Sequence, residues 1–223
     1  MKQYLCPSIM CGDLLNLERE IRTLEKGRAD LIHFDMMDTT FTVQTMLPAI
    51  LIPQIRKATQ IPLDIHVMIR NPETFLDELL KSCKGCFVQL HIESTNRINL
   101  LLEKIREAGA YPGIALNSGT PLSLLEETVP HVELINVILG NAGLGAQRLD
   151  AQLLDKVKRA RALADSAGKK DMVIQVDGGV SFETALAVQR EGANAYVLGT
   201  KSIYGQERGT EEKLDELRML LEA

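Results

Sequence analysis

Eight short runs of apolar and β-branched residues alternate with amphipathic stretches along this chain. Each run has the length of a strand, and each amphipathic stretch repeats its apolar residues with a helical period. Strict alternation predicts parallel strands joined by crossover helices. The predicted strands are 5–9, 31–36, 63–68, 87–92, 113–116, 134–139, 172–176 and 195–198, and the predicted helices are 14–24, 49–58, 74–80, 98–108, 122–129, 151–164, 182–191 and 211–221.

The number of these units favours a closed barrel over an open doubly wound sheet. A (β/α)8 barrel needs a little over about 200 residues, and the chain has 223. An open sheet usually has fewer strands and, when it binds a dinucleotide, a G-x-G-x-x-G sequence after the first strand. The segment Cys11-Gly12-Asp13 does not match that sequence. We therefore predict a single α/β domain, a (β/α)8 TIM barrel, over residues 1–223.

Composition narrows the classes of partner. The formal net charge is -5, so the chain offers no basic stripe for a nucleic acid backbone. Its apolar runs are too short for a membrane span, and the N-terminal segment lacks the apolar stretch of a signal peptide. The four cysteines show no disulfide-scaffold spacing, which suits a reducing compartment. We expect a cytoplasmic protein that binds neither nucleic acid nor membrane.

Polar residues gather where the second, third and seventh predicted strands end, which is where barrels of this kind carry their chemistry. Alternation places His33 and Asp35 on one inward face of the second strand, and His66 and Asp177 join them from the other two. Two imidazoles and two carboxylates suit Zn²⁺, Fe²⁺, Mn²⁺ or Co²⁺, with positions left for a substrate that chelates through two oxygens. The sequence predicts one divalent metal ion and leaves its identity open.

His91 and Glu93 in the fourth strand repeat the spacing of His33 and Asp35. We expect them to support the metal site or the fold from behind rather than to bind the metal. His131, which precedes the sixth strand, is predicted to lie at the surface.

Glycine-rich loops follow the last three strands and predict a phosphate site. Backbone N–H groups at such turns bind phosphate without positive side chains, and the loops after strands seven and eight are its commonest position in this fold. The loops are 140–147, 178–179 and 199–201, and the candidate binding residues in them are Gly143, Gly145, Gly178, Gly179, Gly199 and Thr200.

Five motifs together resemble those of the ribulose-phosphate 3-epimerase family, from about residue 5 to about residue 205. The resemblance implies a (β/α)8 barrel of the ribulose-phosphate-binding type that forms homo-oligomers. The motifs are Pro7-Ser8-Ile9, His33-x-Asp35-x-Met37-Asp38, Asp64-x-His66-x-Met68, Leu116-Asn117-x-Gly119-Thr120-Pro121 and Val176-Asp177-Gly178-Gly179.

The resemblance also implies a reaction. The family's metal ligands carry over onto the same two histidines and two aspartates, and Asp35 and Asp177 become the acid/base groups on opposite faces of the substrate. Ser8 contacts the substrate, and Met37 and Met68 line the reacting centre. One carboxylate removes the C3 proton of a ketose phosphate, an enediolate forms, and the other returns a proton to the opposite face. The expected reaction converts D-ribulose 5-phosphate to D-xylulose 5-phosphate.

Departures from the family's pattern leave the substrate open. Residues 38–45 and 141–147 differ from the usual loops, Ile138 replaces a methionine, and Lys201 replaces an alanine. Another ketose phosphate, such as D-allulose 6-phosphate, therefore remains an alternative substrate. A catalytically inactive regulator that binds a phosphosugar is the other alternative, although it would not need two opposed carboxylates and a metal.

Overall fold

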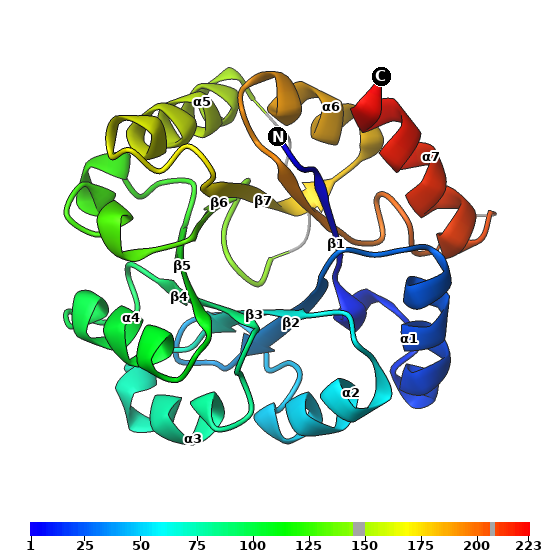
Figure 1. Ribbon diagram of the computed structural model, residues 1–223, viewed down its shortest axis with the longest axis horizontal. Coiled ribbons are helices and arrows are strands. Elements are labelled where there is room, and N and C mark those ends of the chain that lie inside the picture. The colour runs from blue at the N-terminus through cyan, green and yellow to red at the C-terminus, as the bar shows by residue number, and fades with distance from the viewer. Residues whose placement is uncertain (145–149, 206–207) are drawn as a thin grey trace.

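The computed structural model describes residues 1–144, 150–205 and 208–223. It consists of parallel strands that form a nearly closed barrel inside a ring of helices (Figure 1). Neighbouring strands follow the order β1-β8-β7-β6-β5-β4-β3-β2, which confirms the predicted (β/α)8 fold. The strands are β1 (Tyr4–Pro7), β2 (Ile32–Met37), β3 (Leu63–Met68), β4 (Phe87–His91), β5 (Tyr111–Leu116), β6 (Leu134–Ile138), β7 (Val173–Val180) and β8 (Ala195–Leu198).

The barrel closes where β1 meets β2, and we call this junction the β1–β2 seam. A parallel bridge pairs Ser8 with His33. Lower down, the backbone N–H groups of Asp30 and Leu31 both donate to the carbonyl oxygen of Leu5, at 3.0 and 3.4 Å. The seam therefore holds together through a few separate bonds, whereas the other neighbouring strands pair through ladders, of which only the one between β7 and β8 is irregular among the described strands.

Helices cover the outer face of the barrel. Asp150 caps α5 by accepting from the N–H of Leu153, and Ser181 caps α6 by accepting from the N–H of Thr184. No helix within the described ranges has the length and apolar character needed to cross a membrane. The helices are α1 (Leu17–Lys26), α2 (Ile52–Ala58), α3 (Leu76–Leu80), α4 (Ile98–Glu107), α5 (Ala151–Ser166), α6 (Phe182–Arg190) and α7 (Thr210–Glu222), with 3-10 turns η1 (Ile9–Cys11), η2 (Leu14–Asn16), η3 (Ala49–Leu51), η4 (Pro72–Thr74), η5 (Leu122–Leu125) and η6 (Val129–His131).

Apolar side chains divide into an outer core and a small inner cluster. The outer core lies between the strands and the helices and includes Phe34 and Ile65, both fully buried. Burying an aliphatic or aromatic side chain of this size contributes about 1.5–3 kcal/mol. The inner cluster alternates along the strands with the polar residues described below, so it fills the N-terminal end of the barrel. Its members are Cys6, Leu31, Leu134, Val173 and Ala195.

Candidate metal centre and substrate cavity

Four side chains meet at the C-terminal end of the barrel. His33 and Asp35 extend from β2, His66 from β3 next to Asp35 in the strand register, and Asp177 from β7. One nitrogen or oxygen of each lies within 4.8 Å of the others. His33 Nε2 is 3.2 Å from Asp35 Oδ1, and His66 Nδ1 is 3.4 Å from Asp177 Oδ2. The structure thus brings the four predicted ligands together.

The donor set fits a metal ion. His66 Nδ1 is buried and has no hydrogen-bond partner, although buried polar atoms are normally satisfied. It lies 3.5 Å from Asp35 Oδ1, too far for a good hydrogen bond. Two nitrogens and two carboxylate oxygens around one point match the ligands that Zn²⁺ and related divalent ions take. A cation between these atoms would satisfy the orphaned nitrogen.

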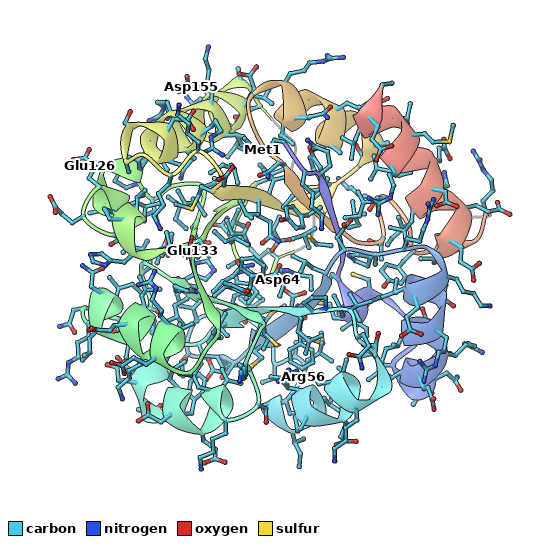
Figure 2. The ribbon with its side chains drawn as sticks, in the orientation of Figure 1. Met1, Arg56, Asp64, Glu126, Glu133 and Asp155 are labelled. Atoms are coloured by element: carbon cyan, nitrogen blue, oxygen red, sulfur yellow. The ribbon has the colours of Figure 1, made fainter. Side chains whose placement is uncertain are left out.

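Asp64 fixes the orientation of His33 from inside the barrel. Its Oδ2 accepts from His33 Nδ1 at 2.7 Å, which leaves Nε2 facing the cluster. Asp64 is fully buried and lies near the middle of the ring of helices (Figure 2). Burial lowers the pKa of His33, but the charges of Asp35 and Asp64 outweigh burial and raise this pKa well above its ordinary value. A metal cation in the cluster would instead favour the neutral imidazole.

Buried amides satisfy Asp64 on its other sides. Gln175 donates to Asp64 Oδ2 at 2.6 Å, and Gln89 donates to Oδ1 and to the side-chain oxygen of Gln175. Asn136 donates to Gln89 at 2.9 Å. Gly113 leaves room for this arrangement, because a Cβ there would lie 2.9 Å from Gln89 Cγ. Burial opposes ionisation of Asp64, but His33 and the two glutamines hold its pKa below its ordinary value.

His91 and Glu93 lie on the side of His66 that faces away from the four-residue cluster. His66 Nε2 is 2.9 Å from His91 Nε2, and His91 Nδ1 is 3.0 Å from Glu93 Oε2. Burial lowers the pKa of His91 to about 4. Burial alone would raise the pKa of Glu93, but its contacts with His91 and Thr120 lower that pKa to about 2. At neutral pH a neutral imidazole therefore separates His66, a candidate ligand, from a carboxylate.

A cavity of about 270 Å³ opens above the metal centre. Asp35 and Asp177 form part of its wall, whereas His33 and His66 are fully buried behind it. Ser8 Oγ donates to Asp35 Oδ2 at 2.6 Å. Gly145 lies outside the described residues. The other residues predicted to contact substrate all line the cavity: Ser8, Met37, Met68, Gly143, Gly178, Gly179, Gly199 and Thr200.

The glycine-rich loops form one end of this cavity. Gly178 and Gly179 have φ values of +108° and +68°, a region that side chains other than glycine rarely adopt. They lie in an irregularity where the register between β7 and β8 shifts. Lys201 also lines the cavity and is the one lysine or arginine among the described lining residues. This end combines backbone N–H groups with one cationic side chain.

The loop of residues 38–45 reaches across the mouth of the cavity. Gln44 Nε2 donates to the carbonyl oxygen of Gly143 at 3.1 Å. Arg70 binds Thr40 of this loop. Its backbone N–H donates to the Thr40 hydroxyl, and its Nε donates to the Thr40 carbonyl oxygen. The Phe41 ring packs on His91, with centroids 4.7 Å apart. The segment in which the chain departs from the family's pattern therefore forms part of the site.

Sequence reasoning missed the support given by Asp64, Gln89 and Gln175. The signal was available, because the three residues lie two positions before His66, His91 and Asp177, and alternation places such pairs on one face.

The chain is similar to known proteins over most of its length. The model of the ribulose-phosphate 3 epimerase family matches residues 4–203. The chain is 35% identical over 202 residues to a ribulose-phosphate 3-epimerase of Bacillus subtilis (strain 168), covering 91% of this chain and 92% of the relative. It is 32% identical to ribulose-phosphate 3-epimerase 1 of Cupriavidus necator, covering 90% of this chain and 84% of the relative.

Solved structures support the fold alone. A mutant tryptophan synthase alpha-subunit from Pyrococcus furiosus aligns over 100% of both chains with a TM-score of 0.68 and 18% identity. A second mutant of that subunit gives a TM-score of 0.70 at 16% identity, covering 98% of this chain and 100% of the other. The family match and the curated relatives carry the assignment further: the chain belongs to the ribulose-phosphate 3-epimerase family and is an epimerase, a member of the isomerase class.

Proposed function

We propose that this protein inverts C3 of a ketose phosphate, with D-ribulose 5-phosphate and D-xylulose 5-phosphate as the first substrate pair to test. The observation that carries the proposal is the convergence of His33, Asp35, His66 and Asp177 around one point at the base of the cavity. The names of the curated relatives support the choice of pentose phosphate.

The proposal assigns the four converging side chains to one divalent metal ion. When bound there, the ion would supply Lewis acidity to the carbonyl and neighbouring hydroxyl of the sugar, which makes the C3 proton more acidic. The orphaned Nδ1 of His66 supports this assignment. His33 presents its Nε2 because Asp64 accepts from its Nδ1.

Asp35 and Asp177 are proposed as the two acid/base groups. They come from β2 and β7, which are separated in the barrel by β1 and β8, and both line the cavity. Inversion needs one group to remove the C3 proton and another to deliver a proton to the opposite face of the planar enediolate. Burial opposes ionisation of Asp35, but His33 and His66 lower its pKa, so this carboxylate is ionised at neutral pH.

The glycine-rich end of the cavity is proposed to bind the phosphate group. Gly178 and Gly179 leave the backbone accessible because they carry no side chains, and Lys201 adds positive charge. Binding at this end would extend the sugar toward the two aspartates. Met37 and Met68 would then line the reacting carbons with adaptable apolar surface.

The test is to follow C3 in deuterated water. Metal-loaded protein is incubated with D-ribulose 5-phosphate and, separately, with D-allulose 6-phosphate, while NMR records deuterium at C3 and formation of the epimer. Exchange with inversion is expected for at least one sugar, and the faster one is the better substrate. Folded, metal-loaded protein that exchanges neither sugar would reject the proposal and favour a binding role.

A further inference from the structure

Lys156 is a buried lysine outside the cavity. It lies on α5, which packs against β6 and β7 (Figure 1). Its exposed fraction is 4%. Its ammonium donates to the carbonyl oxygens of Asn117, Ser118 and Thr120 at 2.7, 2.9 and 2.6 Å. An ammonium has three donors, so these acceptors satisfy it completely. Burial lowers the pKa of Lys156 to about 8, which leaves it charged at neutral pH.

The loop held by Lys156 turns its own donors toward Glu93. The backbone N–H of Asn117 donates to Glu93 Oε1 at 2.9 Å, and its side-chain amide does so at 3.3 Å. The hydroxyl of Thr120 donates to the same oxygen. The segment 117–120 therefore places its carbonyl oxygens against Lys156 and its donors against Glu93.

The hydrogen bonds behind His66 then fix where its proton lies. An ionised Glu93 can only accept, so His91 carries its proton on Nδ1 and donates to Glu93 Oε2. His91 Nε2 is then an acceptor, and the proton between the two rings belongs to His66 Nε2. This leaves a lone pair on His66 Nδ1, the atom that faces the metal centre.

We propose that Lys156 is a positioning residue for the metal centre: by holding residues 117–120 it keeps Glu93 and His91 in place and so sets the tautomer of His66 that binds metal. The same segment reaches the cavity, because Asn117 Oδ1 accepts from the backbone N–H of Ala142 at 2.8 Å. Lys156 thus connects the ligand His66 with a loop of the cavity wall. The inference rests on one part of the proposed function, the assignment of a metal ion to the four converging side chains.

The test compares Lys156→Met with Lys158→Met, an exposed lysine on the same helix. Zinc affinity is measured by competition with a chromophoric chelator. Nitrogen-15 shifts of the His66 ring are recorded in zinc-free protein at about pH 7.5, above the ordinary pKa of an imidazole and below that of Lys156. Lys156→Met is expected to weaken zinc binding by about tenfold or more and to mix the two His66 tautomers. Lys158→Met should match the wild type in both measurements.

A double-mutant cycle separates positioning from general stability. Glu93→Gln alone should weaken zinc binding, and adding Lys156→Met to it should produce little further loss, because Lys156 acts through Glu93. Additive losses would overturn the inference, as would wild-type affinity and tautomer in Lys156→Met. If Lys156→Met does not fold, Lys156→Gln replaces it, because its amide offers only two donors for the three carbonyl oxygens, and wild-type zinc affinity and tautomer there would also overturn the inference.

The outcomes also separate this inference from the proposed function. A wild-type protein that binds zinc without exchanging C3 deuterium would reject the epimerase proposal, while the zinc comparison would still decide the role of Lys156. A wild-type protein that binds no zinc would overturn both.

Discussion

The two histidines of the metal centre are supported in different ways. His33 donates directly to the carboxylate of Asp64, whereas His66 reaches the carboxylate of Glu93 only through the ring of His91. A carboxylate partner makes an imidazole a better electron donor to a metal. We therefore expect His33 to be the stronger ligand and Asp64 to govern metal affinity more than Glu93 does.

The first prediction concerns Asp64→Asn. This change keeps the shape of the side chain but removes the buried charge that orients His33. Zinc affinity should fall by about 10–100-fold, as for other residues that orient a metal ligand. Competition titration checks this, with the exposed Asp171→Asn as the control. A loss smaller than that of Glu93→Gln would contradict the proposed ranking.

The second prediction concerns Asp177→Asn. The amide cannot take up or return a proton, so turnover should fall by about 10²–10⁴-fold, the usual contribution of an acid/base group. The fold should be retained, because the side chain lies at the cavity wall and is 19% exposed. C3 deuterium exchange and circular dichroism provide the measurements. Near wild-type epimerisation would reject this role.

The third prediction concerns Lys201→Ala. Lys201 lines the cavity with the glycine-rich loops proposed to bind the phosphate and has no assigned acid/base role, so its loss should raise KM by about tenfold with little change in kcat. Steady-state kinetics of Lys201→Ala and of the exposed Lys158→Ala give the comparison. An unchanged KM would mean that the backbone N–H groups alone bind the phosphate.

Period-two alternation was sufficient to predict the four clustered residues but did not reveal what supports them. Asp64 sits on the same face of β3 as His66, and this position could have been predicted. The contacts of Lys156 could not, because they join α5 to a loop more than thirty positions earlier, with a separation of 36 to 39 residues. Such a partner depends on how the helix packs, which a local pattern does not contain.

At the level of elements, the 38–45 loop and the 140–144 segment meet over the cavity at Gly143. A Cβ on Gly143 would lie 2.7 Å from Thr42, and the residue has a φ of +72°. The meeting of the two segments therefore depends on glycine at this position. Gln44 adds a hydrogen bond to the same residue.

The fourth prediction is that Gly143→Ala separates these two segments. Strain at positive φ and the contact with Thr42 should together cost about 1–3 kcal/mol and raise KM, because the cavity mouth no longer closes. Thermal unfolding and kinetics are compared with Gly209→Ala, where a Cβ meets open space. Equal behaviour of the two variants would show that the segments do not need this contact.

All eight predicted strands have counterparts in the barrel, but several predicted elements differ in their bounds, and two differ more markedly. The predicted helix 122–129 forms the 3-10 turns η5 and η6, because the hydrogen bonds there span three residues, as from the N–H of Leu124 to the carbonyl oxygen of Pro121. β7 continues to Val180, beyond the expected end, because Gly178 and Gly179 absorb the register shift. Both differences arise from backbone geometry that hydrophobic patterning does not report.

At the level of the whole molecule, polar groups occupy the upper interior of the barrel and apolar groups the lower. Asp64 and His33 lie above the inner apolar cluster, which alternation along the strands places at the N-terminal end. The fold confirms the predicted architecture. The predicted single domain, homo-oligomer and cytoplasmic location stay predictions.

The fifth prediction is the acid sensitivity of the metal-free protein. His91 has a folded pKa of about 4 against an ordinary 6.5, so its contribution to the free energy of unfolding is present above pH 6.5 and is lost as pH falls through 4. Glu93 has a folded pKa of about 2 against 4.5, so its contribution is present above pH 4.5 and is lost as pH falls through 2. The melting temperature should therefore fall continuously below about pH 6.5.

Calorimetry with a chelator present checks this pH dependence. Glu93→Gln should be destabilised by about 2 kcal/mol at neutral pH, and its difference from the wild type should shrink below pH 4.5. A difference that stays constant down to about pH 3 would contradict the proposed ionisation of Glu93.

The β1–β2 seam has a consequence for the lifetime of the bound metal. Ser8 and His33 form the bridge that closes the barrel, and the same two residues contact Asp35. Thermal opening of this junction would therefore separate His33, a proposed metal ligand, from Ser8, which donates a hydrogen bond to the proposed ligand Asp35. Amide hydrogen exchange at the seam and spontaneous zinc release should then share one rate. The lifetime of the bound metal would be limited by how often β1 and β2 separate.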